Sequence, residues 1–224
     1  MNAIIFPALE DADNTGLLAL GGDLSVDTLL TAYSSGIFPW PWSERYLAWF
    51  APPQRAVLFL DNFHVSKRLK SIIKKKEYEI RADTNFEKVI NACAKSKNRT
   101  GQKGTWITKP MIQAYIDLHK AGFAHSIECY FDGELCGGVY GVSIGKMFAG
   151  ESMFYTAPNA SQIAFYHLVE LLNAQNVKII DCQVMTPHSE KFGAVEIDRE
   201  EFMSILTKSV RGKGLDFSVN RLSS

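Results

Sequence analysis

The sequence predicts an α+β protein in which a small N-terminal domain is followed by a larger one with a mostly antiparallel sheet and flanking helices. Apolar segments typical of strands alternate with segments of helical periodicity, and three strand-like segments follow one another with only short turns between them. The chain has 224 residues, 46% of them apolar, so it can bury a sizeable core. We place the two domains at residues 1–54 and 55–224.

The N-terminal domain is expected to hold one helix and a stiff aromatic segment. Ser25 is a good N-cap, an apolar stripe follows at helical spacing, and Gly36 is placed to end the helix. The segment SSGIFPWPW comes next, at residues 34–42. Its prolines fix their own φ and push the preceding residues toward extended geometry, so we expect Trp40 and Trp42 on a stiffened loop. Such a loop is either a corner of the core or a rigid surface for a planar ligand.

The first part of the larger domain alternates strands and helices. Residues 55–60 and 78–82 are predicted strands on either side of a basic helix. The segment TNFE, which begins at Thr84, has the form of a capping box and predicts a helix to about residue 94. Thr108 as N-cap, with a proline in the first turn and a glycine as stop, predicts the next helix.

A meander of three antiparallel strands is predicted after these helices. Its strands cover residues 124–131, 134–144 and 146–154, and Asp132-Gly133 is a strong signal for the first hairpin. The remaining predicted elements are a helix over about 159–175, a strand over 177–184 and a helix over about 199–208.

Composition excludes several classes of protein. No leader pattern and no window near about 18 uninterrupted apolar residues is present, so we expect a cytoplasmic protein without a membrane segment. The four cysteines are dispersed and lack a C-x-x-C pair, which favours free thiols. The common motifs for nucleotide hydrolysis, dinucleotide binding and zinc or serine hydrolysis are absent. We therefore expect neither a metal nor a cofactor.

Charge is unevenly distributed although the formal net charge is zero. Half of the 24 basic residues lie in two acid-free segments, residues 64–76 and 88–116. Such segments suit a phosphate backbone, but from charge alone solvated helix or loop faces are the simpler explanation. The candidate backbone contacts are Lys67, Arg68, Lys70, Lys74, Lys75, Lys76, Lys95, Lys97, Arg99 and Lys103.

Polar residues interrupt two of the predicted strands. Glu151 lies inside the run MFAGESMF, and Asp181 and Gln183 share one face of the strand that contains IIDCQV. A buried carboxylate is costly unless it is paired or hydrogen-bonded, so these residues form either a structural network or a reactive site. Trp106, after a basic loop, either anchors the core or lines a site, and aromatic rings beside positive charge suit a single-stranded nucleic-acid end.

Nine segments, taken together and in order, resemble the bacterial leucyl/phenylalanyl-tRNA-protein transferases. They are GLLALGGDLS, LLTAYSSGIFPW, WFAPPQRAVL, GTWIT, AYIDLHKAGFAHSIE, GGVYGV, FAGESMF, IDCQV and GAVEIDREEF. They run from Gly16 to Phe202 and cover most of the chain.

The resemblance implies an enzyme that transfers Leu or Phe from aminoacyl-tRNA to the N-terminal amine of proteins beginning with Arg or Lys. An apolar pocket for these side chains should also accept Met, since one methylene group discriminates only weakly. This transfer marks the acceptor for degradation by the N-end rule pathway. The resemblance also implies an acetyltransferase-like (GNAT) fold for the larger domain. Separately, we expect a monomer. The acyl-CoA pyrophosphate signature, [QR]-x-x-G-x-[GA], is not found, as expected for a tRNA donor.

The resemblance also assigns roles to residues. Trp40 matches the residue that meets the 3′-terminal adenosine of the tRNA, and Tyr33 and Trp106 match aromatic positions of the same site. The polar positions at the reacting ester are matched by Glu151, Asp181 and Gln183. The walls of the pocket for the Leu or Phe side chain are matched by Phe148, Ile180 and Val139, the last of which stands where a methionine is expected.

The chemistry needs little beyond positioning, because an aminoacyl ester is already activated. An α-amino group has a pKa of about 7.7–8.0, so roughly a tenth to a fifth of it is free at pH 7. We expect Asp181 to hold Gln183 or to accept a proton, Gln183 to align the incoming amine, and Glu151 to position the ester.

Two other classes remain open from the sequence. An RNA-binding module would not require the three polar residues, and a coenzyme A acyltransferase would be expected to carry the missing signature. An acidic first residue on the acceptor also remains open.

Overall fold

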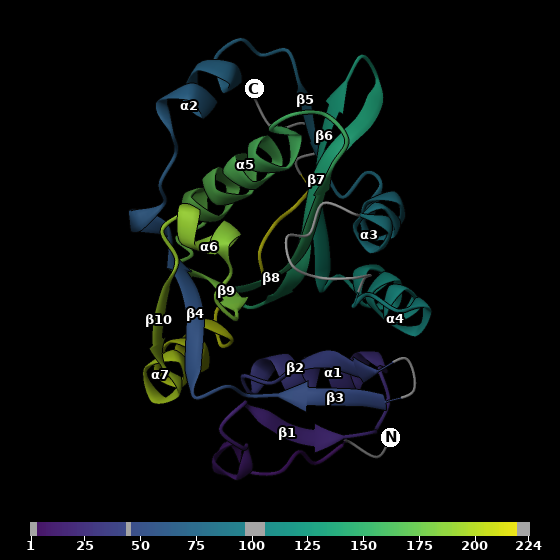
Figure 1. The fold of residues 1–224 in the computed structure, drawn as a ribbon, viewed down its shortest axis with the longest axis vertical. Helices are drawn as coiled ribbons and strands as arrows, with labels where there is room; N and C mark the ends of the chain where they lie inside the picture. The colour runs from purple at the N-terminus through teal and green to yellow at the C-terminus, as the bar shows by residue number, and fades with distance from the viewer. Residues whose placement is uncertain (1–3, 44–45, 97–105, 219–224) are drawn as a thin grey trace.

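The computed structural model describes residues 4–43, 46–96 and 106–218 and has two sheets (Figure 1). The smaller sheet has the strand order β1-β3-β2 and the larger one β10-β4-β9-β8-β7-β6-β5. Every strand pair is antiparallel except β8 with β9, so the predicted α+β class with a mostly antiparallel sheet is confirmed.

The elements of the chain are as follows. The strands are β1 (Leu17–Leu20), β2 (Phe38–Ser43), β3 (Tyr46–Phe50), β4 (Gln54–Phe59), β5 (Glu79–Ala82), β6 (Ala124–Phe131), β7 (Glu134–Ile144), β8 (Met147–Tyr155), β9 (Ile179–Gln183) and β10 (Val195–Asp198). The α-helices are α1 (Val26–Ser34), α2 (Lys67–Ile73), α3 (Phe86–Lys95), α4 (Lys109–Lys120), α5 (Ala160–Ala174), α6 (Pro187–Lys191) and α7 (Arg199–Ser209).

The aromatic segment of the N-terminal unit is a strand, not the predicted loop. Trp40 and Trp42 lie in β2, where Trp40 pairs with Ala48 of β3. This strand tolerates Pro39 and Pro41 because β2 lies at the edge of its sheet. Residues two apart in a strand face the same neighbour, so the N–H groups that both prolines lack would have pointed to the unpaired side. The extended geometry was therefore predicted correctly, but the partner strand β3 was not recognised.

The helix predictions were mostly confirmed, with one wrong cap. The side chains of Ser25 and Thr108 cap α1 and α4 as predicted. Thr84 does not cap α3; its hydroxyl donates to Glu128 on β6 at 2.6 Å, and the N-cap is Asn85 without a side-chain bond. The buried Glu128 carboxylate also accepts the backbone N–H of Asn85, so it replaces the predicted capping box.

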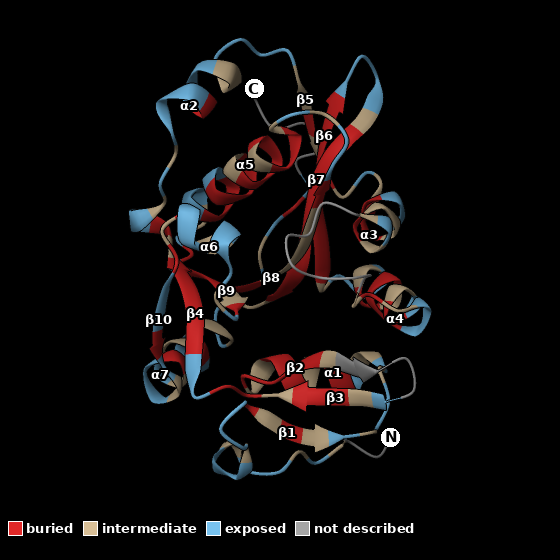
Figure 2. Ribbon diagram, in the orientation of Figure 1, coloured by how far each residue is buried: buried red, intermediate tan, exposed pale blue. Residues whose placement is uncertain are grey.

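Helices cover both faces of the larger sheet. Helix α5 packs on β6 and β7, and α3 and α4 pack on the opposite face, with their buried sides toward the sheet (Figure 2). One hydrophobic cluster joins Leu29 and Trp49 of the N-terminal unit to Tyr115 and Tyr140 of the larger one. The domain boundary at residues 54/55 stays a prediction, because this core is continuous across it.

The larger sheet splits near its centre, where the parallel strands β8 and β9 diverge. The two strands pair only at Phe148 with Ile180 and at Ala149 with Asp181. Strand β8 continues to Tyr155, while β9 ends at Gln183 in the left-handed region, with φ at 64°. The polar residues predicted from the sequence lie where the strands separate.

No helix in the described ranges has the length and apolar character required to cross a membrane.

Gly145→Ala should destabilise the protein more than Gly133→Ala. Both glycines lie in hairpin turns with positive φ, 58° and 78°, so alanine costs about 1–2 kcal/mol at either position. A β-carbon at Gly145 would lie 2.5 Å from the carbonyl oxygen of Ser209, whereas one at Gly133 meets nothing within 4 Å. We expect an additional loss of about 1–3 kcal/mol for Gly145→Ala in urea unfolding. Equal losses would contradict the close packing of this turn on the end of α7.

Candidate active site

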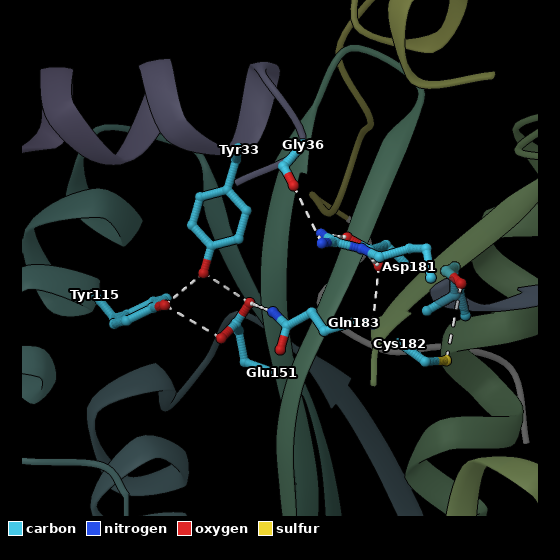
Figure 3. A network of polar contacts seen from close by, with 9 residues as sticks. Tyr33, Gly36, Tyr115, Glu151, Asp181, Cys182 and Gln183 are labelled. Carbon is cyan, nitrogen blue, oxygen red and sulfur yellow. Dashed lines mark hydrogen bonds and ion pairs between the residues drawn. The ribbon is translucent and has the colours of Figure 1, made fainter. Parts of the chain in front are cut away.

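A carboxylate, an amide and two phenols form one hydrogen-bonded group where β8 and β9 separate (Figure 3). Gln183 Nε2 donates to Glu151 Oε1 at 2.8 Å. Tyr33 donates to the same oxygen at 2.8 Å, and Tyr115 donates to Oε2 at 3.1 Å. The group therefore gathers residues from α1, α4, β8 and β9. Tyr115 was not predicted, because a tyrosine in the apolar stripe of a helix looks like an ordinary core residue.

Asp181 lies behind this group and does not line the hollows described below. Its two oxygens accept from Arg55 Nε at 2.8 Å and Nη2 at 2.7 Å. Oδ1 also accepts the backbone N–H of Gln183 at 2.8 Å. Asp181 therefore positions Gln183, as expected, but it does so by accepting the backbone N–H of Gln183 and not by contacting its side chain. Both of its oxygens are already engaged by the buried guanidinium, and the alternative that it accepts a proton stays a prediction.

Arg55 is a residue of the site that the sequence analysis missed. It is 2% exposed, its Nη1 donates to the carbonyl oxygen of Gly36, and its guanidinium lies 4.6 Å from the ring centroids of both Phe38 and Phe202. A single arginine inside the apolar run QRAVLF was the available signal, since a buried charge requires a partner.

Burial sets the protonation of the group. It raises the pKa of Glu151 to about 7, although the hydrogen bonds from Tyr33, Tyr115 and Gln183 act in the opposite direction. Burial and the neighbouring Glu151 charge hold the pKa of both tyrosines well above the ordinary value. The phenols are therefore permanent donors at neutral pH, whereas Glu151 can gain or lose a proton.

An apolar cavity of about 170 Å³ opens beside Glu151. It is lined by Ile180 and Val139, two of the three residues that the resemblance assigns to the pocket for the donor side chain. Phe148 does not line it and is 1% exposed beneath the sheet surface, so its assigned role stays a prediction. The other apolar walls, which the sequence analysis missed, are Leu58, Met153, Phe165 and Phe192.

A larger cleft of about 470 Å³ shares Glu151 with this cavity and extends past Gln183. Trp40 and Trp106 line it and stack on each other, with ring centroids 5.0 Å apart and an angle of 13° between the rings. A planar ligand would therefore use an outer face of the pair. Cys182 lines both hollows, but burial raises the pKa of its thiol to about 12, so it is not a nucleophile at neutral pH.

The predicted basic contacts within the described residues lie outside both hollows. Six of them are exposed on α2 and the residues that follow it: Lys67, Arg68, Lys70, Lys74, Lys75 and Lys76. Lys95 is exposed at the end of α3, next to Ser96, which lines the cleft. Three others, Lys97, Arg99 and Lys103, lie outside the described residues. Within the described ranges, no three potential metal ligands gather at one place.

Two family models match the chain in succession. The model described as the leucyl/phenylalanyl-tRNA protein transferase N-terminal domain matches residues 22–53, and the one described as leucyl/phenylalanyl-tRNA protein transferase matches residues 57–207. The chain belongs to the leucyl/phenylalanyl-tRNA protein transferase family. It is accordingly an aminoacyltransferase.

Relatives of the transferase align with it over nearly its whole length. Proteins named leucyl/phenylalanyl-tRNA–protein transferase from Maridesulfovibrio salexigens and Flavobacterium johnsoniae are 46% and 48% identical to it. The alignments cover 94% and 91% of this chain and 88% and 95% of the relatives. Among solved structures, L-PGS from Bacillus licheniformis aligns over 70% of this chain and 65% of its own, at 14% identity and a TM-score of 0.43. That similarity is too slight to support an argument.

Glu151→Gln should change how the stability of the transferase depends on pH. Because the pKa of Glu151 is about 7 in the folded protein and 4.5 ordinarily, the folded state keeps a proton that the unfolded chain releases. The stabilisation is complete below about pH 4.5 and is lost as the pH rises to about 7. Relative to the variant, the wild type should lose on the order of 1–3 kcal/mol between about pH 5 and 8 in urea unfolding. If the difference in unfolding free energy between wild type and variant did not change with pH, burial would be contradicted as the cause of a raised pKa of Glu151.

Proposed function

We propose that the transferase moves Leu or Phe, and less readily Met, from aminoacyl-tRNA to the N-terminal α-amine of proteins that begin with Arg or Lys. The observation that carries the proposal is that the apolar cavity and the aromatic-lined cleft meet at Glu151, next to Gln183. An aminoacyl ester has the same three parts in the same order: an apolar side chain, a reacting carbonyl and a nucleoside.

The apolar cavity suits the donor side chain. Full burial of a Leu or Phe side chain contributes about 1.5–3 kcal/mol, which selects for apolar donors. One methylene group discriminates only weakly, so several apolar donors should react. Val139 is smaller than the methionine expected there, which favours Phe over a strict preference for Leu.

The cleft suits the terminal adenosine. Bases stack on aromatic side chains with about 1–3 kcal/mol each, and the stacked Trp40–Trp106 pair presents aromatic surface to the cleft. Because Trp40 lies on a paired strand, its ring is ordered before the RNA binds, which lowers the entropy cost of binding. The basic residues of α2 would meet more distant tRNA phosphates, so affinity should fall as salt rises.

The reaction itself forms a C–N bond and breaks the ester C–O bond. Gln183 donates one N–H to Glu151, while its side-chain oxygen accepts no hydrogen bond from the described residues and can accept one from the incoming amine. Glu151 has a pKa near neutrality, which suits it to take a proton from the amine and return one to the departing ribose oxygen. Asp181 then acts by fixing the backbone of Gln183.

The charge of the cleft favours a basic acceptor. Glu151 is the only acidic residue among the described residues that line the cleft, and Asp181 lies just behind it. A first residue of Arg or Lys is attracted to the Glu151 carboxylate, whereas Asp or Glu is repelled. We further propose that the enzyme acts as a monomer in the cytoplasm.

Transfer of labelled Leu from charged tRNA to peptides that differ only in their first residue tests the proposal. We expect incorporation onto Arg and Lys peptides at least about tenfold faster than onto Ala or Asp peptides, since about 1.4 kcal/mol of charge discrimination suffices. Added coenzyme A should change nothing. Incorporation onto no peptide would refute the function, and a preference for Asp would refute the acceptor assignment.

A further inference from the structure

The first turn of α5 presents unpaired polar groups at the cleft. Ser161 lines the cleft, is 3% exposed, and its hydroxyl makes no hydrogen bond with the described residues. The backbone N–H groups of Ser161 and Gln162 likewise have no acceptor in that part of the chain. Asn159 precedes the helix with φ at 65°, and its side chain does not cap it. A ligand in the cleft can therefore complete hydrogen bonds with the Ser161 hydroxyl and with the N–H groups of this turn.

These groups have the chemistry of an anion site. Free N–H groups at a helix N-terminus, together with the positive end of the helix dipole, attract negative charge. The first turn of α5 contains no acidic residue that would fill this role. In α1 and α4, by comparison, the side chains of Ser25 and Thr108 already occupy the equivalent place.

The turn is held rigidly against the sheet. A β-carbon at Gly137 of β7 would lie 2.6 Å from the carbonyl carbon of Ala160 and 2.9 Å from the amide nitrogen of Ser161. Only glycine permits this approach, so the first turn of α5 is fixed in place before any ligand binds. Such pre-organisation lowers the entropy cost of binding.

We propose that Ser161 and the first turn of α5 bind a backbone phosphate of the three 3′-terminal nucleotides of the donor RNA. The inference rests on the proposed function. Of the groups that the cleft would receive, the acceptor amine and its basic side chain are cationic and are repelled by a helix N-terminus, and the donor side chain is apolar. The RNA is the ligand that carries negative charge.

The test uses the leucyl ester of the trinucleotide CpCpA as donor, with each of its two phosphodiesters replaced in turn by a neutral methylphosphonate. In the wild type, one of the two replacements should raise KM about tenfold, the usual scale of a charge-assisted hydrogen bond. Ser161→Asp should raise KM for the natural donor by a similar factor and should abolish the difference between natural and neutral donors. An acid at this position is favourable for the helix itself, so the variant should fold.

Two further variants keep the test decisive. Asn173→Asp adds the same charge at an exposed position in the last turn of α5, away from the cleft, so it should retain the full effect of the neutral linkage. Ser161→Ala removes only the hydroxyl and should raise KM for the natural donor a few-fold.

The outcomes separate the inference from the function on which it rests. If the wild type uses both neutral donors as well as the natural one, or if Ser161→Asp responds to them as the wild type does, the inference is wrong while transfer stands. If neither the natural trinucleotide nor charged tRNA donates Leu, the proposed function itself fails.

Discussion

The site depends on one buried ion pair, that of Arg55 with Asp181. Two charges removed from water are stable only with close geometry and satisfied hydrogen bonds, and both conditions are met here by two bonds of 2.8 and 2.7 Å. The same guanidinium reaches the carbonyl oxygen of Gly36 and lies over the rings of Phe38 and Phe202. It therefore ties the N-terminal unit and α7 to the central strand β9.

The ion pair is connected to the hydrogen-bonded group at Glu151 through Gln183. Asp181 fixes the backbone of Gln183 in an uncommon left-handed conformation, and this directs the amide of Gln183 to Glu151. Tyr33 and Tyr115 complete the shell around that carboxylate. The two phenols come from α1 and α4, so the site exists only when the N-terminal unit is docked on the sheet. Burial of Glu151 itself brings its pKa near neutrality, although the hydrogen bonds donated by the two phenols act in the opposite direction.

The features that were predicted correctly from the sequence are those determined by interactions between neighbouring residues. The caps at Ser25 and Thr108 and the Asp132-Gly133 hairpin were confirmed, since each is settled within a few residues. Pairing across the chain could not be seen: the strand character of Trp40 depends on β3, and the hydroxyl of Thr84 is taken by a distant carboxylate. The site residues Glu151, Asp181 and Gln183 were identified because carboxylates and amides are uncommon inside apolar strands. The strands β1 and β10, the helix α6 and the aromatic walls of the cavity carried no comparable anomaly.

The stability and transfer activity of two variants test most directly whether the ion pair places Gln183. Arg55→Met alone should lower the free energy of unfolding by about 3–5 kcal/mol, because it leaves a buried carboxylate unpaired. The double variant Arg55→Met with Asp181→Leu should recover most of that stability, since apolar side chains can replace a buried pair. It should nevertheless remain slow in single-turnover transfer, because the backbone N–H of Gln183 has lost its acceptor. A double variant that is both stable and as fast as the wild type would contradict the account.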